Sequence, residues 1–156
     1  MHIRLIAVGD KQPSWVDTAF SDYAGRLPRQ WKFRLDTIAA GQRTKNYAAL
    51  SARETEGRKV LASIGSDDFV VLLDERGETL SSRGLGERLG NWQSAGRDLC
   101  FVIGGPDGVS TECGERADFR WSLSRMTLPH GLARVMFGEQ LYRAWTLTQG
   151  HPYHRG

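Results

Sequence analysis

Cysteine is scarce in this chain, which has only two among its 156 residues, Cys100 and Cys113. They are not in Cys-x-x-Cys spacing, so the sequence predicts neither a zinc ribbon nor a disulfide framework. Two isolated thiols of this kind are typical of reduced cysteines in a cytoplasmic protein, and the cytoplasm is the localisation that we expect.

Long hydrophobic runs are also missing. No purely apolar run exceeds that of residues 69–73, which is far below the roughly 20 residues needed to cross a bilayer. The apolar start, residues 3–8, is followed closely by Asp10 and Lys11. We therefore expect neither a membrane span nor a signal peptide.

Net charge is small, because 21 lysines and arginines face 18 aspartates and glutamates, for a formal charge of +3. The placement is uneven: residues 25–45 hold six basic residues against one acidic residue, and residues 119–156 hold five arginines against Glu139 alone. Aromatic residues lie within both basic zones: Trp31, Phe33, Trp145 and Tyr153. Such zones suit a polyanion such as RNA, with an ordinary solvated surface as the alternative.

The hydrophobic pattern predicts strands and helices that alternate along one domain. Short apolar runs predict strands at residues 3–8, 33–38, 69–73, 99–103 and 119–123, with a turn at 74–77. Helical spacing predicts helices over about 14–27, 47–64, 85–92, 111–117 and 132–147. Because parallel neighbours need a crossover, usually a helix, this alternation predicts an α/β fold with a mostly parallel sheet and flanking helices.

Ligands of such sheets bind at the carboxyl ends of the strands, so the loops after Leu73, Ile103 and Leu123 form the candidate site. Residues 104–108, Gly-Gly-Pro-Asp-Gly, can bring backbone close to a ligand, although they match neither the dinucleotide fingerprint nor the P-loop. Residues 123–130 can wrap a small molecule with main-chain groups. A tight connection and a plain linker are the alternatives for these two segments.

The tail at residues 151–155 carries two imidazoles, a phenol and a guanidinium in a stretch that is too short and polar to build core. A frayed terminus is the alternative interpretation. The two histidines have no further cysteine or histidine ligands nearby, so we expect no metal site.

Three segments carry a specific resemblance: residues 103–108, residues 122–130, and residues 141–145 together with 151–155. They resemble the small bacterial SPOUT methyltransferases of the large-subunit rRNA methyltransferase H family. Residues 7–9 with Trp15, and residues 40–46, also fit that family. The resemblance implies a homodimeric SPOUT α/β-knot with a trefoil knot in the C-terminal part. It also implies an enzyme that uses S-adenosylmethionine to methylate N3 of a pseudouridine in 23S rRNA of the assembled ribosome.

The resemblance further implies which residues form the site. His154 is the candidate base, Arg143 and Arg155 would stabilise charge, and Tyr153 would position the base. The acceptor of the N3 proton stays open, because water can also take it. The implied cofactor-binding residues are Leu73, Gly104, Gly105, Leu123, Ser124, Arg125, Met126, Thr127 and Leu128.

We expect residues 1–156 to form one domain, in which residues 150–156 are a catalytic tail that stays mobile until cofactor and RNA bind. The last helix has apolar residues, including Phe137, Leu141 and Trp145, around more of its circumference than one sheet face needs, which predicts a homodimer. Two alternatives remain for the function. The first is a non-catalytic ribosome-binding assembly factor, and the second is a SPOUT methyltransferase that acts on another RNA, such as tRNA.

Overall fold

The computed structural model describes residues 1–9, 11–41 and 49–155, and their side chains except those of Ala49, His154 and Arg155. Five strands form one sheet in the order β2-β1-β4-β3-β5, and every neighbouring pair is parallel. The predicted parallel α/β fold is therefore confirmed. The strands are β1 (Ile3–Val8), β2 (Arg34–Ile38), β3 (Phe69–Thr79), β4 (Leu99–Ile103) and β5 (Phe119–Ser122).

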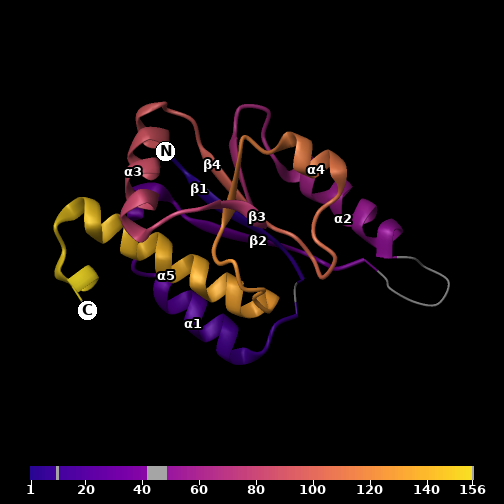
Figure 1. The fold of residues 1–156 in the computed structure, drawn as a ribbon, viewed down its shortest axis with the longest axis horizontal. Coiled ribbons are helices and arrows are strands. Elements are labelled where there is room, and N and C mark those ends of the chain that lie inside the picture. Colours follow the sequence, from indigo (N-terminus) through magenta and orange to yellow (C-terminus); the bar gives the residue numbers. More distant parts are fainter. Residues whose placement is uncertain (10, 42–48, 156) are drawn as a thin grey trace.

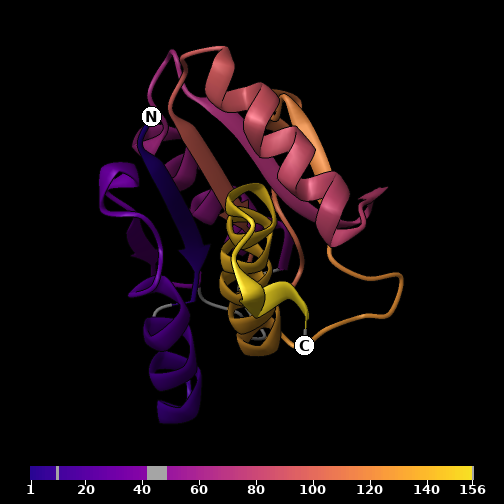
Figure 2. The same ribbon diagram turned by 90° about the vertical axis from the view of Figure 1, so that its left-hand side faces the viewer.

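Helices cover both faces of the sheet (Figures 1 and 2). They are α1 (Ser14–Ala24), α2 (Ala49–Ser63), α3 (Ser82–Ser94), α4 (Thr111–Arg116) and α5 (His130–Gln149), with short 3₁₀ turns η1 (Arg29–Trp31) and η2 (Pro152–Arg155). One core cluster joins the sheet to α1, α3 and α5, and a second joins it to α2 and α4. The result is three layers with the sheet in the middle.

The sequence of the central strand β4 is apolar throughout because both of its faces are covered by helices. Successive strand residues point to opposite faces, so Phe101 packs in the first cluster while Cys100 and Val102 pack in the second. All five residues of β4 are buried. Phe101 meets Phe137 of α5 edge-on, with 4.9 Å between ring centroids. Cys100 and Cys113 are both buried free thiols, and burial raises the pKa of Cys100 to about 11.

The predicted turn at residues 74–77 is wrong, because β3 continues through these residues to Thr79. The pairing with β5 shifts its register between Leu73 and Glu78. A Cβ atom on Gly77 would lie 2.7 Å from the backbone carbonyl group of Arg120. Glycine is therefore needed at position 77 for the close approach of two backbones rather than for a turn.

Helices α1 and α5 lie side by side and run in the same direction (Figure 1). Two glycines of α5 allow this contact: a Cβ atom on Gly131 would lie 2.8 Å from Val16, and one on Gly138 would lie 3.3 Å from Phe20. On the sheet-facing side of α5, Phe137 and Leu141 are fully buried within the same chain. The chain's own core therefore accounts for these two apolar residues, and the homodimer stays a prediction.

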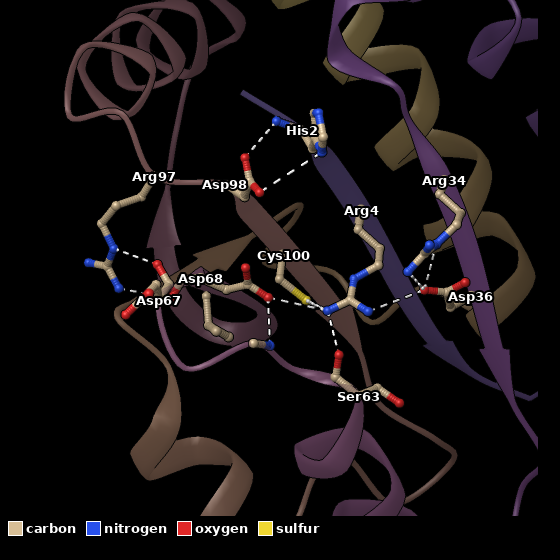
Figure 3. Close-up of polar contacts among 12 residues, drawn as sticks. His2, Arg4, Arg34, Asp36, Ser63, Asp67, Asp68, Arg97, Asp98 and Cys100 are labelled. Atoms are coloured by element: carbon tan, nitrogen blue, oxygen red, sulfur yellow. Dashed lines mark hydrogen bonds and ion pairs between the residues drawn. The ribbon is translucent and has the colours of Figure 1, made fainter.

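Arg4 ties several segments together at the amino-terminal edge of the sheet (Figure 3). Its guanidinium donates to the carboxylates of Asp36, at 3.4 Å, and Asp68, at 3.2 Å. It also donates to the backbone carbonyl of Ser63 at the end of α2. Arg97 and Arg116 both donate to the backbone carbonyl of Asp68, so three arginines hold the segment that precedes β3.

Replacing Arg4 by methionine is expected to lower the free energy of unfolding by about 2–4 kcal/mol, because two partly buried carboxylates each lose a charged hydrogen-bond donor. Urea unfolding measures the loss. Arg34→Met is the matched control, since Arg34 is 64% exposed and pairs with the same Asp36. Its loss should stay below about 1 kcal/mol. Equal losses in the two variants would contradict a special role of Arg4.

Candidate functional site

The strands β1 and β4 end at the carboxyl edge of the sheet beside Leu73 of β3, which itself continues to Thr79. The register pairs Leu73 with Ile103, and Ile103 with Ala7, so β3, β4 and β1 reach this edge side by side. Gly104 follows β4 and Gly9 follows β1. The structure thus brings Leu73 and the glycine loop, residues 104–108, to one place, as the topology of a parallel sheet requires.

The glycine loop turns tightly back on itself. The Gly108 N–H donates to the Gly105 carbonyl at 3.0 Å, and Gly108 adopts a left-handed backbone with φ of 81°. A Cβ atom would lie 2.7 Å from Val109 if placed on Gly104, and 2.9 Å from Glu56 Oε1 if placed on Gly105. These contacts explain both glycines without a ligand, so their role in cofactor binding stays a prediction.

Glu56 is a buried carboxylate beside the glycine loop, and it is not among the residues predicted from the sequence. It lies on α2, is 2% exposed, and accepts a hydrogen bond from the Gly41 N–H at 2.7 Å. Its other oxygen faces the position that a Gly105 side chain would occupy. Glu56 therefore links α2, the segment after β2 and the glycine loop. Its place four residues from both Ala52 and Val60, which are buried, is the helical signal in the sequence that identifies it.

The loop at residues 123–128 leads from β5 to α5 and stands out from the sheet (Figure 2). Ser124 shapes it: its hydroxyl accepts from the Met126 N–H at 2.9 Å, and its carbonyl accepts from the Ser122 hydroxyl at 2.8 Å. The Thr127 hydroxyl donates to Glu75 at 3.0 Å, which ties the loop to the extension of β3. Arg125 is exposed, and the Met126 side chain is 77% exposed.

This loop and the glycine loop suit a small molecule held by main-chain groups. Within the described chain, no backbone-to-backbone hydrogen bond involves residues 124–128, and two of their main-chain groups, the Ser124 carbonyl and the Met126 N–H, bond to serine hydroxyls. The other N–H and C=O groups of this segment are available to a ligand. Leu73 and Leu123 are partly buried and add apolar surface beside them. Leu128 is also partly buried.

Two residues at the start of α5 hold the end of β1. Arg134 is 1% exposed, and its Nη2 donates to the Gly9 carbonyl at 2.7 Å. The His130 ring lies beside Gly9, and its Nε2 atom is buried without a hydrogen-bond partner among the described residues. Burial, followed by the charge of Arg134, lowers the pKa of His130, although a hydrogen bond with the backbone of Gly104 opposes this shift. The ring is therefore neutral at pH 7.

The tail packs back on α5 through Tyr153. The Tyr153 hydroxyl donates to Glu139 Oε1 at 2.9 Å, and its ring meets Tyr142 edge-on with 4.7 Å between centroids. Arg143 donates to the same Glu139 oxygen from Nε at 2.9 Å and from Nη2 at 2.6 Å, and it lies over the Tyr153 ring. The structure thus brings Arg143 and Tyr153 together.

These contacts also affect protonation. Burial, followed by the hydrogen bond to Glu139, raises the pKa of Tyr153, and the hydrogen bond to Glu139 raises the pKa of Arg143. Both groups are therefore protonated at neutral pH. The side chains of His154 and Arg155 lie outside the described residues. The mobility expected for residues 150–156 stays a prediction, and the docking of Tyr153 is the contact that opposes it.

The two groups of predicted site residues lie at opposite ends of α5 (Figure 1). The loop at residues 123–128 precedes this helix and the tail follows it. Since α5 has 20 residues, its ends are about 30 Å apart. Within one chain, the structure does not bring the tail to the glycine loop or to the loop at residues 123–128.

Three further predictions concern the first basic zone, a metal site and a membrane span. Arg43, Lys45 and Asn46, which belong to a basic zone and to the resemblance, lie outside the described residues. In the described part of the chain, no three histidine, cysteine, aspartate or glutamate side chains are grouped as a metal site. Nor does any described helix have the length and apolar character needed to cross a membrane.

Solved structures share this arrangement of strands and helices. A methylase family protein from Haemophilus influenzae superposes with a TM-score of 0.58 over 95% of this chain and 66% of its own, at 9% identity. Another, from Neisseria gonorrhoeae, gives a TM-score of 0.54 over 90% of this chain and 81% of its own, at 15% identity. At these identities the likeness shows the fold alone.

Sequence relatives cover the full length. The family model described as "Predicted SPOUT methyltransferase" matches residues 1–154. Proteins named "Ribosomal RNA large subunit methyltransferase H" from Thioalkalivibrio sulfidiphilus and Methylococcus capsulatus are each 48% identical over 155 residues. Each alignment covers 99% of this chain, together with 99% and 100% of the respective relative. The expected family is thereby confirmed, and this chain belongs to the SPOUT methyltransferases.

Proposed function

We propose that this protein uses S-adenosylmethionine to methylate N3 of a pseudouridine in 23S rRNA, and that it acts on assembled ribosomes in the cytoplasm. Membership of the SPOUT methyltransferase family supports methyl transfer. The names of relatives that match over the full length support the large-subunit rRNA as substrate. The observation that carries the proposal is the pair of loops at the carboxyl edge of the sheet, where main-chain groups without a partner among the described residues are available to a small molecule.

The cofactor fits these loops chemically. When bound, S-adenosylmethionine supplies a methyl group that is already electrophilic, so the protein has to align the attacking nitrogen and manage one proton. The backbone of Gly104 and Gly105 and the main chain of residues 123–128 would hold it, with Leu73 and Leu123 against its apolar parts. The side chain of Arg125 has no assigned role.

Arg143 of α5 and the tail residues would act on the RNA base. The N3–H of pseudouridine is weakly acidic, and its nitrogen attacks well only as the proton leaves. Arg143 and Arg155 would stabilise the negative charge that develops on the base. His154 is the candidate proton acceptor, with water as the alternative, and Tyr153 would position the base.

The length of α5 supports a site shared between two subunits. A tail of seven residues spans at most about 25 Å when fully extended, which is less than the roughly 30 Å of α5. The tail of one chain would therefore complete the site at the cofactor loops of the other chain. Trp15 is 54% exposed and Leu132 is 37% exposed, at the starts of α1 and α5, and they offer apolar surface for this homodimer.

Sedimentation at micromolar concentration is expected to show twice the chain mass of 17.5 kDa. Trp15→Glu should shift the protein toward monomer, because it places a charge in the proposed interface. Leu50→Glu is the control, since Leu50 is 56% exposed but lies on α2, over the opposite face of the sheet. A parent protein that sediments as a monomer would contradict the dimer.

Gly105→Trp is expected to abolish binding of S-adenosylhomocysteine in calorimetry, because its side chain would fill the proposed cofactor site. Gly90→Trp on α3 is the control, since a Cβ atom there meets no neighbour within 4 Å. Circular dichroism checks folding, because Glu56 lies close to position 105. Met126→Pro, in an exposed loop, removes the N–H that donates to the Ser124 hydroxyl, so it changes the shape of the loop and should also weaken binding. Parental affinity in folded forms of both variants would show that the site lies elsewhere.

The reaction itself is tested on ribosomes that lack the modification. They are incubated with the protein and methyl-labelled S-adenosylmethionine, the RNA is digested, and the labelled nucleoside is identified by mass spectrometry. We expect the label in methylated pseudouridine of 23S rRNA. Label in tRNA would favour the other RNA substrate, and ribosome binding without label would favour an assembly factor.

A further inference from the structure

Glu139 stands out in both the sequence and the structure. It is the only acidic residue after Asp118, in a stretch that contains five arginines. Its side chain is 17% exposed, and its Oε1 atom accepts hydrogen bonds from Nε and Nη2 of Arg143 and from the hydroxyl of Tyr153. One oxygen atom therefore links the two described residues that the proposed mechanism takes from the C-terminal part of the chain.

We propose that Glu139 is a positioning residue for methyl transfer, which fixes Arg143 and Tyr153 in the arrangement in which they meet the RNA base. This inference rests on the proposed function. Glu139 acts through its two neighbours and takes no proton from the substrate itself.

The guanidinium geometry supports this role. An arginine side chain has five N–H donors in a rigid planar fork. Arg143 turns the edge formed by Nε and Nη2 toward Glu139, at 2.9 and 2.6 Å. The donors on Nη1 have no partner among the described residues, so they remain for the substrate. Charge-assisted bonds of this kind fix orientation more firmly than neutral ones.

The same carboxylate anchors the tail. Tyr153 is the second residue of η2, and it is held by the hydrogen bond to Glu139 and by ring contacts with Tyr142 and Arg143. His154 and Arg155 follow directly in the chain. Fixing Tyr153 lowers the conformational entropy that the neighbouring residues lose when they meet the base.

Charge indicates which kinetic constant should change. A carboxylate near RNA repels phosphate groups, so Glu139 does not serve to strengthen RNA binding. A merely structural pair at positions i and i+4 of a helix adds a little to stability and nothing to turnover. A positioning residue instead affects kcat while KM for the ribosome stays nearly constant.

The experiment compares Glu139→Ala and Glu139→Gln with the parent in steady-state methylation of ribosomes. We expect kcat to fall at least about tenfold in Glu139→Ala, with KM and S-adenosylhomocysteine affinity within about twofold of the parent. Glu139→Gln should recover part of the loss, because its amide oxygen still accepts hydrogen bonds. Glu78→Ala is the matched control, because Glu78 pairs with Arg88 at 3.0 Å and its hydrogen bonds in the described chain do not go to Arg143 or Tyr153, so kcat should stay unchanged.

A second measurement reports on the tail without catalysis. Backbone ¹⁵N relaxation should show faster motion of residues 153–155 in Glu139→Ala than in the parent or in Glu78→Ala. The role of Glu139 is overturned if the parent is active and Glu139→Ala matches it in kcat, or if the tail of that variant is as ordered as in the parent. A parent that does not methylate ribosomes would instead overturn the proposed function, and the relaxation data would still report whether Glu139 holds the tail.

Discussion

Deletion of residues 153–156 is expected to lower methyl transfer at least about 10²-fold, because it removes the candidate base and one of the candidate charge-stabilising arginines. Cofactor affinity should stay near the parental value, because the main chain of the two loops, and not the tail, would hold the cofactor. Single-turnover methylation of ribosomes measures the first quantity, and calorimetry with S-adenosylhomocysteine measures the second. A truncated chain that methylates ribosomes at the parental rate would show that the tail is not part of the site.

A mixed dimer identifies the chain whose tail completes each site. One subunit lacks residues 153–156 and the other carries Gly105→Trp. If each tail serves the loops of its partner, one intact site forms, and the activity should be about half that of the parent dimer. If each tail serves its own loops, both sites are defective and no activity remains. The two defective homodimers are the controls.

Arg143→Ala is expected to lower kcat at least about 10²-fold, a loss typical of a removed charge-stabilising donor. Arg143→Lys should recover little, because lysine keeps the charge but lacks the planar fork that binds Glu139 with two donors. Arg26→Ala is the matched control. Arg26 lies over the ring of Tyr142 in the same cluster, but its hydrogen bond goes to Asp22.

The kinetic constants separate two roles for Arg143. A fall in kcat with constant KM supports stabilisation of the reacting base. A rise in KM with constant kcat would make Arg143 a contact for the RNA backbone only. His154→Ala should show the same fall in kcat as Arg143→Ala, and full activity in that variant would leave water as the proton acceptor.

The sequence predicted strands best where both faces of the sheet are covered. The central strand β4 was predicted residue for residue, because a strand buried on both faces is a continuous apolar run. The second half of β3 was not predicted, because Gly77 and the charged residues before it suggested a turn. Glycine after charged residues looks the same whether it forms a turn or allows a neighbouring backbone to come close, and only the position of β5 distinguishes the two.

The site was predicted in part for a similar reason. Topology alone places the ends of β1 and β4 beside Leu73 of β3, so the position of the glycine loop follows from the strand order. The partners of Glu56, Glu139 and Arg134 depend on tertiary packing, and no local pattern reveals them. The distance between the loop at residues 123–128 and the tail could be predicted from the sequence. The predicted helix at residues 132–147 already implies about 24 Å between them.

The two buried cysteines make the protein suitable for site-specific labelling. A thiol with a pKa of about 11, like that of Cys100, is deprotonated in only about one molecule in ten thousand at pH 7, and burial also raises the pKa of Cys113. Maleimides react with exposed thiolates, so both native cysteines should stay unlabelled while the protein is folded. A fluorophore on a new cysteine in the exposed end of α5, such as Thr148→Cys, would then report on the tail without removal of either native thiol.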